Sequence, residues 1–357
     1  MPSRVDYEAA GSVLEDALAH AIDQKSVPVE WVSYARSVFA LDAKTWTPAL
    51  GTILLAKSVN SQIDTMSLKV DPKNDYSYSA RTLCHKVLVP AAVEHNFSIR
   101  NTGREPLNNQ PFFRYLRLDE LDRVKNPADR DFFVDIAEKA ATLSSQEAAS
   151  ALSAFLKVAL EDSSKIQNIK IKSDGLTFSA ALNAVADFLR TDAHDRPRRL
   201  QAFGAACLDL IFHEVKSRRI NDPSTDLPGD VQVFVGTAVT HAMEVRGKPV
   251  SDSELAGFVR ACSAAQVQRA IMFVDSDYQQ PLNLVDLTKL IEVADVQVAV
   301  FTSAEDLLRS AALWPDRPLA ETIENFGGRM LERLREIELK VNSLEEWARA
   351  VAISRGR

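Results

Sequence analysis

Hydrophobic residues recur at helical spacing over most of the chain up to about residue 214. Apolar positions three and four residues apart predict amphipathic helices, whereas strict alternation of apolar and polar positions predicts strands. Near the N-terminus the helical repeat passes through Val13, Leu14, Ala17, Leu18, Ala21 and Ile22. On this basis we expect helices within residues 8–70, one of them at 30–39, and a helix at 76–90 with a bend near Pro90. We also expect a pair of helices over 131–160 and single helices at 176–189 and 199–214.

After Glu214 the pattern changes to alternation and predicts a sheet. We expect strands at 231–235, 240–246, 269–274 and 296–301, a helix at 251–265, and closing helices at 304–313 and 318–352. A strand, a crossover helix and a second strand form a parallel unit. The predicted fold is therefore α/β (α+β), with a mixed central sheet flanked by helices and a largely helical N-terminal region. Its expected parts are a mainly helical region at 1–195, a core at 196–303, and C-terminal helices at 304–357 that pack on the core.

The composition is that of an ordinary globular protein, with 46% hydrophobic and 25% charged residues. No run of about eighteen apolar residues occurs, so the sequence predicts no membrane-spanning helix and no membrane partner. The N-terminal segment carries acids among its apolar residues, which is typical of an amphipathic helix rather than a signal peptide. The three cysteines, Cys84, Cys207 and Cys262, are far apart and suit a reducing compartment. We therefore expect a cytoplasmic protein.

Two carboxylates and two cations stand close together in residues 230–248. A proline turn delivers Asp230 to the start of an apolar run, and Glu244 follows on the next predicted strand, with Arg246 and Lys248 at period two. Alternate residues of a strand share a face, so we expect Glu244, Arg246 and Lys248 to point the same way. Two acids on neighbouring strands beside a cation can hold a hard divalent metal and an attacking water. This arrangement resembles that of the PD-(D/E)xK nuclease fold.

Glu214 follows the apolar positions of the helix expected at 199–214. It falls four residues after Leu210 and so shares the buried face of that helix. A buried carboxylate is costly unless it is paired or bound to a metal. Glu214 is therefore either an edge residue that pairs with Lys216 or Arg218, or a third acid beneath the metal site. We favour the second interpretation because the other two acids follow so closely.

Arg218 and Arg219 come directly after this expected helix, together with Lys216. Cations at a helix C-terminus interact favourably with the helix dipole, which explains one or two of them. Beside a site for a metal and water, the two arginines are also placed to hold phosphates. Farther on, we interpret Asp275-Ser276-Asp277 as the cap of a turn, and a second Mg²⁺ nearby is the alternative.

A loop at residues 98–117 combines the residue types that read base edges. Arg pairs bidentately with guanine, Asn and Gln with adenine, and Glu accepts from cytosine. The alternative is a surface loop stiffened by prolines, with Asn residues making turns. The candidates are Arg104, Glu105, Asn108, Asn109, Gln110 and Arg114, and Arg81 adds a contact from the preceding helix. The net charge of −7 does not suggest a DNA-binding protein, so we expect the acids on the outer surface and these cations in a cleft.

The segments SRRINDPSTDLPGDVQV, MEVRGKPVS, RTLCHKVLVP and TGREPLNNQPFFRY resemble the SacI-type family of restriction endonucleases. The resemblance runs over most of the chain. It implies a type II restriction enzyme of the PD-(D/E)xK class in a prokaryotic cell, which uses Mg²⁺ to cut both strands of a short double-stranded DNA site. It also implies Asp230 and Glu244 as the metal-binding acids and Glu214 as an accessory acid. Arg246 stands where most such enzymes carry the catalytic lysine, and Lys248 is the alternative cation for that role.

Two classes of function remain open on the sequence. One is a Mg²⁺-dependent endonuclease, and the other is a non-catalytic DNA-binding or regulatory protein on a nuclease-like scaffold. The intact pair of Asp230 and Glu244 favours the endonuclease. A palindromic site presents two equivalent phosphates, and a two-fold dimer matches that symmetry, so we expect a homodimer. An endonuclease also needs a DNA methyltransferase that protects the host DNA.

Overall fold

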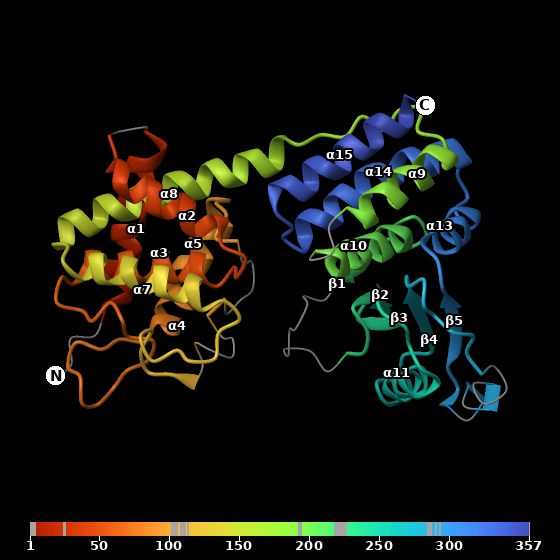
Figure 1. Ribbon diagram of the computed structural model, residues 1–357, viewed down its shortest axis with the longest axis horizontal. Coiled ribbons are helices and arrows are strands. Elements are labelled where there is room, and N and C mark those ends of the chain that lie inside the picture. The colour runs from red at the N-terminus through yellow and green to blue at the C-terminus, as the bar shows by residue number, and fades with distance from the viewer. Residues whose placement is uncertain are drawn as a thin grey trace. The chain divides into compact units, whose positions relative to one another are not determined.

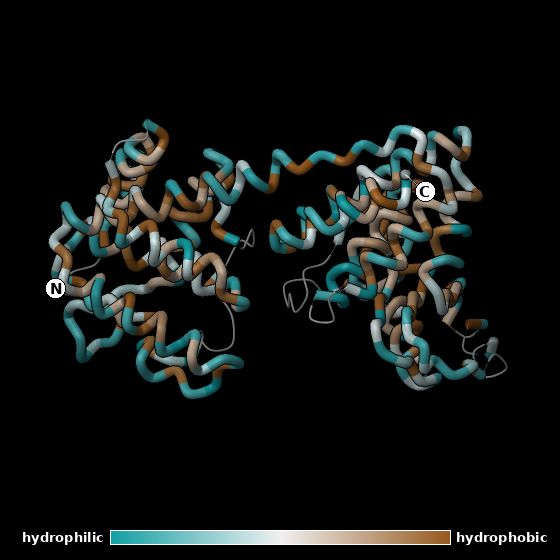
Figure 2. Tube along the Cα trace, turned by 45° about the horizontal axis from the view of Figure 1, so that its top comes forward, coloured by the Kyte–Doolittle hydropathy of each residue, from teal (hydrophilic) through white to brown (hydrophobic). Residues whose placement is uncertain are grey.

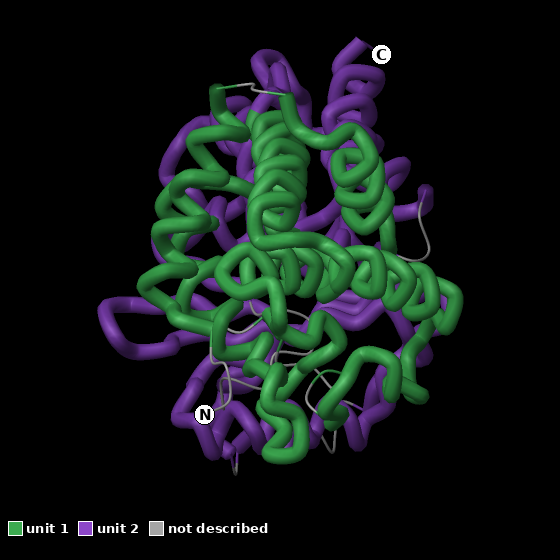
Figure 3. Tube along the Cα trace, turned by 90° about the vertical axis from the view of Figure 1, so that its left-hand side faces the viewer, with its two compact units in different colours: residues 1–167 green, residues 168–357 purple. Residues whose placement is uncertain are grey.

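The computed structural model of the chain describes residues 5–23, 26–100, 106–107, 112, 114–191, 195–217, 227–283, 288–289, 291–292 and 294–356. The chain folds into two compact units, residues 1–167 and 168–357 (Figures 1 and 3). Apolar and polar segments alternate along the helices of each unit (Figure 2). No helix among the described residues is long and apolar enough to cross a membrane.

Unit 1 is built from helices around a buried central helix, α3 (Trp46–Val59). Every residue of α3 from Trp46 to Ser58 is buried, which explains why its sequence is apolar on all sides. Gly51 lets a neighbouring helix approach, because a Cβ at this position would lie 2.8 Å from Phe155 Cε1. The other helices are α1 (Tyr7–Ile22), α2 (Val29–Ala40), α4 (Ala80–Leu83), α5 (Val89–Glu94), α7 (Pro127–Ala141) and α8 (Ser145–Asn168).

The helix expected at 76–90 begins only at Ala80 and is not a simple α-helix. Ser79 caps its start by accepting a hydrogen bond from the Thr82 N–H at 3.2 Å. A π-helical turn, η1 (Cys84–Leu88), separates α4 from α5, and Pro90 lies in the first turn of α5. Proline has no N–H, so Pro90 cannot donate the backbone hydrogen bond that a regular α-helix would form there. The π-helical turn η1 lies directly before this position.

Unit 2 holds a five-stranded mixed sheet with the order β1-β2-β3-β4-β5. Its strands are β1 (Val215–Ser217), β2 (Val231–Val235), β3 (Ala238–Arg246), β4 (Arg269–Val274) and β5 (Gln297–Phe301). The first three strands are antiparallel, whereas β3, β4 and β5 run parallel (Figure 1). The four expected strands and their mixed arrangement are confirmed, and β1 is an addition.

Helices cover both faces of this sheet. On one face, α10 (Arg196–Asp209) packs so closely that a Cβ added at Gly204 would lie 2.8 Å from Met243 Sδ. On the other face, α11 (Asp252–Ala264) packs against Ala242, Ala270 and Met272. The remaining helices of the unit are α9 (Phe178–Arg190), α13 (Ala304–Leu313), α14 (Leu319–Glu336) and α15 (Val341–Arg355), of which α9, α13 and α14 also contact α10. The chain is thus mostly helical, with its sheet in the C-terminal half.

Two expected helix boundaries are wrong. The helix expected at 199–214 ends at Asp209, so Glu214 does not lie on its buried face. The segment expected to be helical over 318–352 is divided between Glu336 and Val341, where Glu338 adopts a φ of 59°. A positive φ is strained in a residue with a Cβ and ends a right-handed helix.

Candidate active site

A short turn places Asp230 against β3. Gly229 adopts a φ of 81°, and a Cβ on it would lie only 2.7 Å from Met243 O, so only glycine fits here. The Asp230 N–H donates to Met243 O at 2.8 Å. Asp230 Oδ2 in turn accepts a hydrogen bond from the Val245 N–H at 2.9 Å. Asp230 therefore contacts β3 on both sides of Glu244, the residue between these two partners.

Glu244 lies on the face of β3 that is covered by α11. Two residues earlier, Ala242 is part of the core beneath α11, and alternate residues of a strand share a face. The side chain of Glu244 is 16% exposed and forms an ion pair with Arg246, whose side chain is 51% exposed. Burial raises the pKa of Cys262, on α11, to about 12, and the nearby negative charge of Glu244 adds to this rise. Glu244 is thus a largely buried acid whose charge is balanced by an exposed guanidinium.

The two acids fit a magnesium ion. Mg²⁺ is usually held by one or two carboxylates, with water and substrate phosphate completing its coordination. Asp230 and Glu244 would supply two carboxylates from neighbouring strands of one hairpin. Among the residues that the structure describes, no group of three or more His, Cys, Asp or Glu side chains could hold a metal. Asp230 and Glu244 would thus be the protein's two carboxylate donors to such an ion.

Lys248 does not continue the strand of Glu244 and Arg246. The strand β3 ends at Arg246, and residues 247–248 form a bend. The strand alternation that predicted Lys248 on the same face therefore ends two residues before it. Lys248 is exposed just past the end of the strand.

The ends of β3 and β4 are tied together by Arg196, at the start of α10. Its Nη2 donates to Asp275 Oδ2 at 2.8 Å and to Asp275 O at 3.0 Å, and its Nη1 donates to Gly247 O at 3.3 Å. The Asp275 N–H donates to Arg246 O at 2.9 Å. Burial raises the pKa of Asp275, and Arg196 opposes this shift. Sequence reasoning interpreted Asp275 as part of a turn cap, and its ion pair with Arg196 was missed because the partners are far apart in the chain.

Glu214 lies away from Asp230. It is exposed, and its Oε1 lies 2.9 Å from Lys216 Nζ, which is the pairing that one of the two interpretations expected. The Phe234 N–H donates to Glu214 O at 2.8 Å, so Glu214 lies beside the end of β2 that is opposite to Asp230. Four residues of strand span about 13 Å. The structure therefore does not bring Glu214 together with Asp230 and Glu244.

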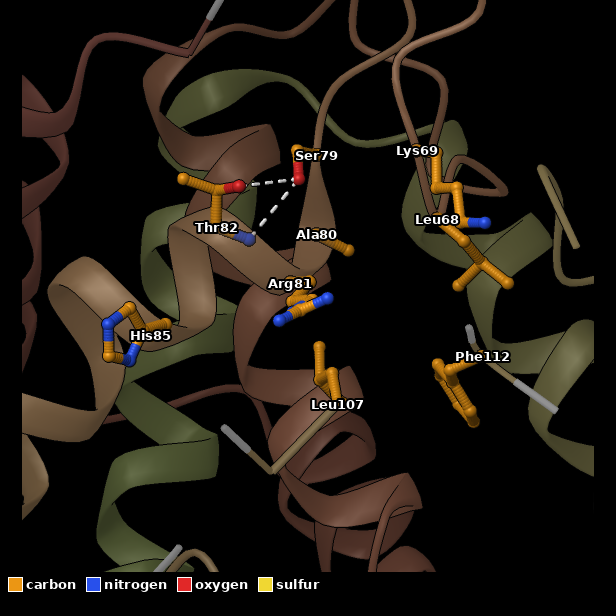
Figure 4. A pocket seen from close by; sticks show the side chains of 9 residues that line it. All are labelled: Leu68, Lys69, Ser79, Ala80, Arg81, Thr82, His85, Leu107 and Phe112. Carbon is orange, nitrogen blue, oxygen red and sulfur yellow. Dashed lines mark hydrogen bonds between the residues drawn. The ribbon is translucent and has the colours of Figure 1, made fainter. Parts of the chain in front are cut away.

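Unit 1 contains a pocket of about 360 Å³ beside the start of α4 (Figure 4). Three basic residues, Lys69, Arg81 and His85, line it, and none of the described lining residues is acidic. The hydroxyls of Ser79 and Thr82 also line it and are hydrogen-bonded to each other at 2.7 Å. The remaining lining residues are apolar: Leu68, Ala80, Leu107 and Phe112. Of these, Leu107 and Phe112 belong to the loop expected to read DNA. The pocket is thus a basic concavity in a chain of negative net charge.

Two arginines of the expected basic loop at 98–117 stabilise the fold instead. Arg100 Nη1 donates to Phe39 O at 2.5 Å and to Leu41 O at 2.6 Å. Arg117 forms ion pairs with Asp64 and Asp119. Arg114 is exposed. The expected base-reading residues Arg104, Glu105, Asn108, Asn109 and Gln110 lie outside the described residues, as do Arg218 and Arg219.

Comparison with known proteins connects both units to one family. The family described as the SacI restriction endonuclease N-terminal domain matches residues 9–163, which fall within unit 1. The chain is 37% identical over 352 residues to the type II restriction enzyme SacI of Streptomyces achromogenes. This similarity covers 96% of the chain and 97% of that enzyme, and so includes the hairpin with Asp230 and Glu244. The chain therefore belongs to the SacI restriction endonuclease family.

Proposed function

We propose that the protein is a type II restriction endonuclease that hydrolyses both strands of a short, palindromic site in double-stranded DNA with Mg²⁺. The observation that supports it most is the contact of Asp230 with β3 on both sides of Glu244. It occurs in a chain whose relative SacI, similar over nearly its full length, is a type II restriction enzyme. The unit 2 sheet would be the PD-(D/E)xK core, with the β2–β3 hairpin carrying the acids.

In this proposal Asp230 and Glu244 hold the metal, and the residues around them supply position and charge. The Val245 N–H fixes Asp230 Oδ2, and Arg246 forms an ion pair with Glu244. When bound, Mg²⁺ would lower the pKa of a coordinated water and offset the charge that builds up on the scissile phosphate. Arg246 is exposed, and its guanidinium can donate two parallel hydrogen bonds to a phosphate.

DNA contacts are proposed in both units. In unit 1 the loop at 98–117 would read base edges, and Arg81, at the basic pocket, would contact the DNA beside it. In unit 2 the segment with Arg218 and Arg219 follows β1 and would hold phosphates. A homodimer would give one hairpin to each strand of a palindromic site. A DNA methyltransferase of matching specificity would protect the host.

Digestion of plasmids of known sequence tests this function. With Mg²⁺ the purified protein should produce a fixed set of fragments whose ends share one short sequence. With EDTA in place of Mg²⁺ it should produce none. Binding to one sequence without any cleavage, over a range of divalent metals, would instead support a DNA-binding protein that does not cut.

A further inference from the structure

Two glutamines are buried beside the turn that carries Asp230. Gln201, on α10, is 2% exposed, and Gln232, on β2, is 5% exposed. Polar side chains at such depth are unusual and need hydrogen-bond partners, because an unpaired buried amide costs roughly 1–3 kcal/mol. The role of these residues is therefore indicated by the groups that their amides contact.

Both amides donate to the same three-residue turn. Gln232 Nε2 donates to Pro228 O at 3.0 Å and to Gly229 O at 2.7 Å. Gln201 Nε2 donates to Asp230 O at 3.0 Å. Three consecutive carbonyls, those of residues 228–230, thus receive side-chain hydrogen bonds. Pro228 and Gly229 are themselves buried, where carbonyls without partners would be costly.

The other side of the turn is fixed by β3. Gly229 packs directly against the backbone of Met243, and the Asp230 N–H donates to Met243 O at 2.8 Å. The Asp230 carboxylate accepts from the Val245 N–H. The turn is therefore held on one side by β3, through the Asp230 N–H and carboxylate, and on the other side by the two glutamines, through its carbonyls. This leaves Asp230 little freedom to move along or away from the hairpin.

We propose that Gln201 and Gln232 are positioning residues that hold Asp230 in the geometry needed to bind the metal. Neither amide would touch the metal or the DNA. This inference rests on the proposed function, in which Asp230 is a metal ligand. A functional side chain must be held to within about 0.5 Å of its productive position, and residues behind the ligands commonly provide this restraint. Gln201 adds a link of its own, because it connects the turn to α10, the helix whose first residue, Arg196, holds the ends of β3 and β4.

The test uses Gln201→Met and Gln232→Met in the full-length protein. Methionine keeps the length and volume of the side chain but cannot donate. The control is Thr322→Val, because Thr322 is also fully buried in unit 2 and loses one side-chain hydrogen bond, to Pro318 O at 3.1 Å. Gln201→Asn and Gln232→Asn, which keep an amide, serve if a methionine variant does not fold. Thermal unfolding gives the folded fraction of each variant, and rates are compared per folded molecule.

We expect each glutamine variant to need about 10–100-fold more Mg²⁺ for half-maximal cleavage. Binding of cognate duplex without metal should stay within a factor of about three of wild type, and Thr322→Val should match wild type in both measurements. If the glutamine variants show the wild-type Mg²⁺ midpoint and rate, or lose rate at an unchanged midpoint, the inference is wrong. Asp230→Ala belongs in the same series. If it cleaves normally, the proposed metal site fails, whereas an inactive Asp230→Ala beside normal glutamine variants overturns this inference alone.

Discussion

At the scale of single residues, Arg246 is the group whose chemistry matters most beyond the two acids. It forms an ion pair with Glu244, yet its side chain is half exposed to solvent. Arginine stays protonated under all ordinary conditions, so it can stabilise negative charge but cannot take a proton from water. We therefore assign Arg246 to the stabilisation of negative charge on the phosphate.

Arg246→Ala should lower kcat by about 10²–10³-fold, because one donor to the developing phosphate charge is lost. Arg246→Lys should lower it less, since the charge remains but the forked geometry does not. Arg309→Ala is the matched control, because Arg309 is also an exposed arginine in an ion pair, with Glu305 on α13. Single-turnover cleavage checks this. A normal rate for Arg246→Ala together with a large loss for Lys248→Ala would assign the role to Lys248.

Base reading and phosphate binding should separate in mutants. Arg104→Ala and Asn109→Ala should each cost about 1–3 kcal/mol on the cognate site and little on unrelated DNA, because they remove base-edge contacts. Arg218→Ala and Arg219→Ala should weaken both kinds of binding alike and flatten the salt dependence. Competition between cognate and scrambled duplexes at two salt concentrations measures both effects. An unchanged cognate preference in Arg104→Ala and Asn109→Ala would remove base reading from this loop.

At the scale of elements, the β2–β3 hairpin is the unit that assembles the site. The turn that leads into β2, residues 228–230, is packed between β3 and two buried glutamines. The turn that connects β2 to β3 contains Gly236, which has a φ of 62°. The hairpin therefore contains two glycines of similar backbone conformation and opposite surroundings. A Cβ at Gly229 would collide with Met243 O, whereas nothing lies within 4 Å of a Cβ at Gly236.

Gly229→Ala should therefore destabilise the protein by about 1–3 kcal/mol more than Gly236→Ala, since both strain φ but only the first also overpacks. Gly229→Ala should also cleave slowly per folded molecule, because relief of the collision moves Asp230 away from β3. Denaturant unfolding and cleavage rates measure the two effects. Equal losses of stability in both variants would show that the turn relaxes without moving Asp230.

The sequence predicted this hairpin well, and it failed where distant contacts decide the structure. Apolar alternation places β2, β3 and β4 correctly because each strand has a buried core face. The helical repeat continues through Ile211, but α10 ends at Asp209, and the Phe212 ring packs against the His241 ring of β3 at 4.5 Å between centroids and an interplanar angle of 48°. The spacing from Leu210 to Glu214 therefore does not place Glu214 on a helix face. The roles of Gln201 and Gln232 could not be predicted from the sequence. The residues around a glutamine in the sequence do not indicate whether its amide will bind solvent or a distant backbone carbonyl.

At the scale of the whole molecule, the formal charge of −7 opposes DNA binding through overall basicity. Affinity for DNA would then come from local groups, and we propose that the basic pocket at Lys69, Arg81 and His85 is one of them. The family model for the N-terminal domain covers 9–163, within unit 1, and the acids lie in unit 2. We thus propose that DNA recognition depends on unit 1 and cleavage on unit 2. Substitutions in unit 1 should then reduce DNA recognition, and substitutions at the acids of unit 2 should reduce cleavage.

The assembly on DNA should be a homodimer. Two equivalent scissile phosphates in a palindromic site are matched by two equivalent hairpins, and a two-fold dimer supplies them. Sedimentation of the protein with a short cognate duplex, with Ca²⁺ in place of Mg²⁺ to prevent cleavage, should give two chains per duplex. A single chain per duplex, together with cleavage of both strands by that species in Mg²⁺, would contradict the dimer.

The central claim is that Asp230 and Glu244 hold the metal that cleavage requires. The most direct measurement is cleavage of cognate DNA in Mg²⁺ by Asp230→Ala and Glu244→Ala, with binding of the same duplex measured in parallel. Glu214→Ala is the control, since Glu214 is an acid of the same unit that lies beside the other end of β2 and pairs with Lys216. We predict that both site variants bind the cognate duplex specifically and do not cleave it, whereas Glu214→Ala cleaves like wild type. Cleavage by Asp230→Ala or Glu244→Ala at near the wild-type rate would contradict the claim.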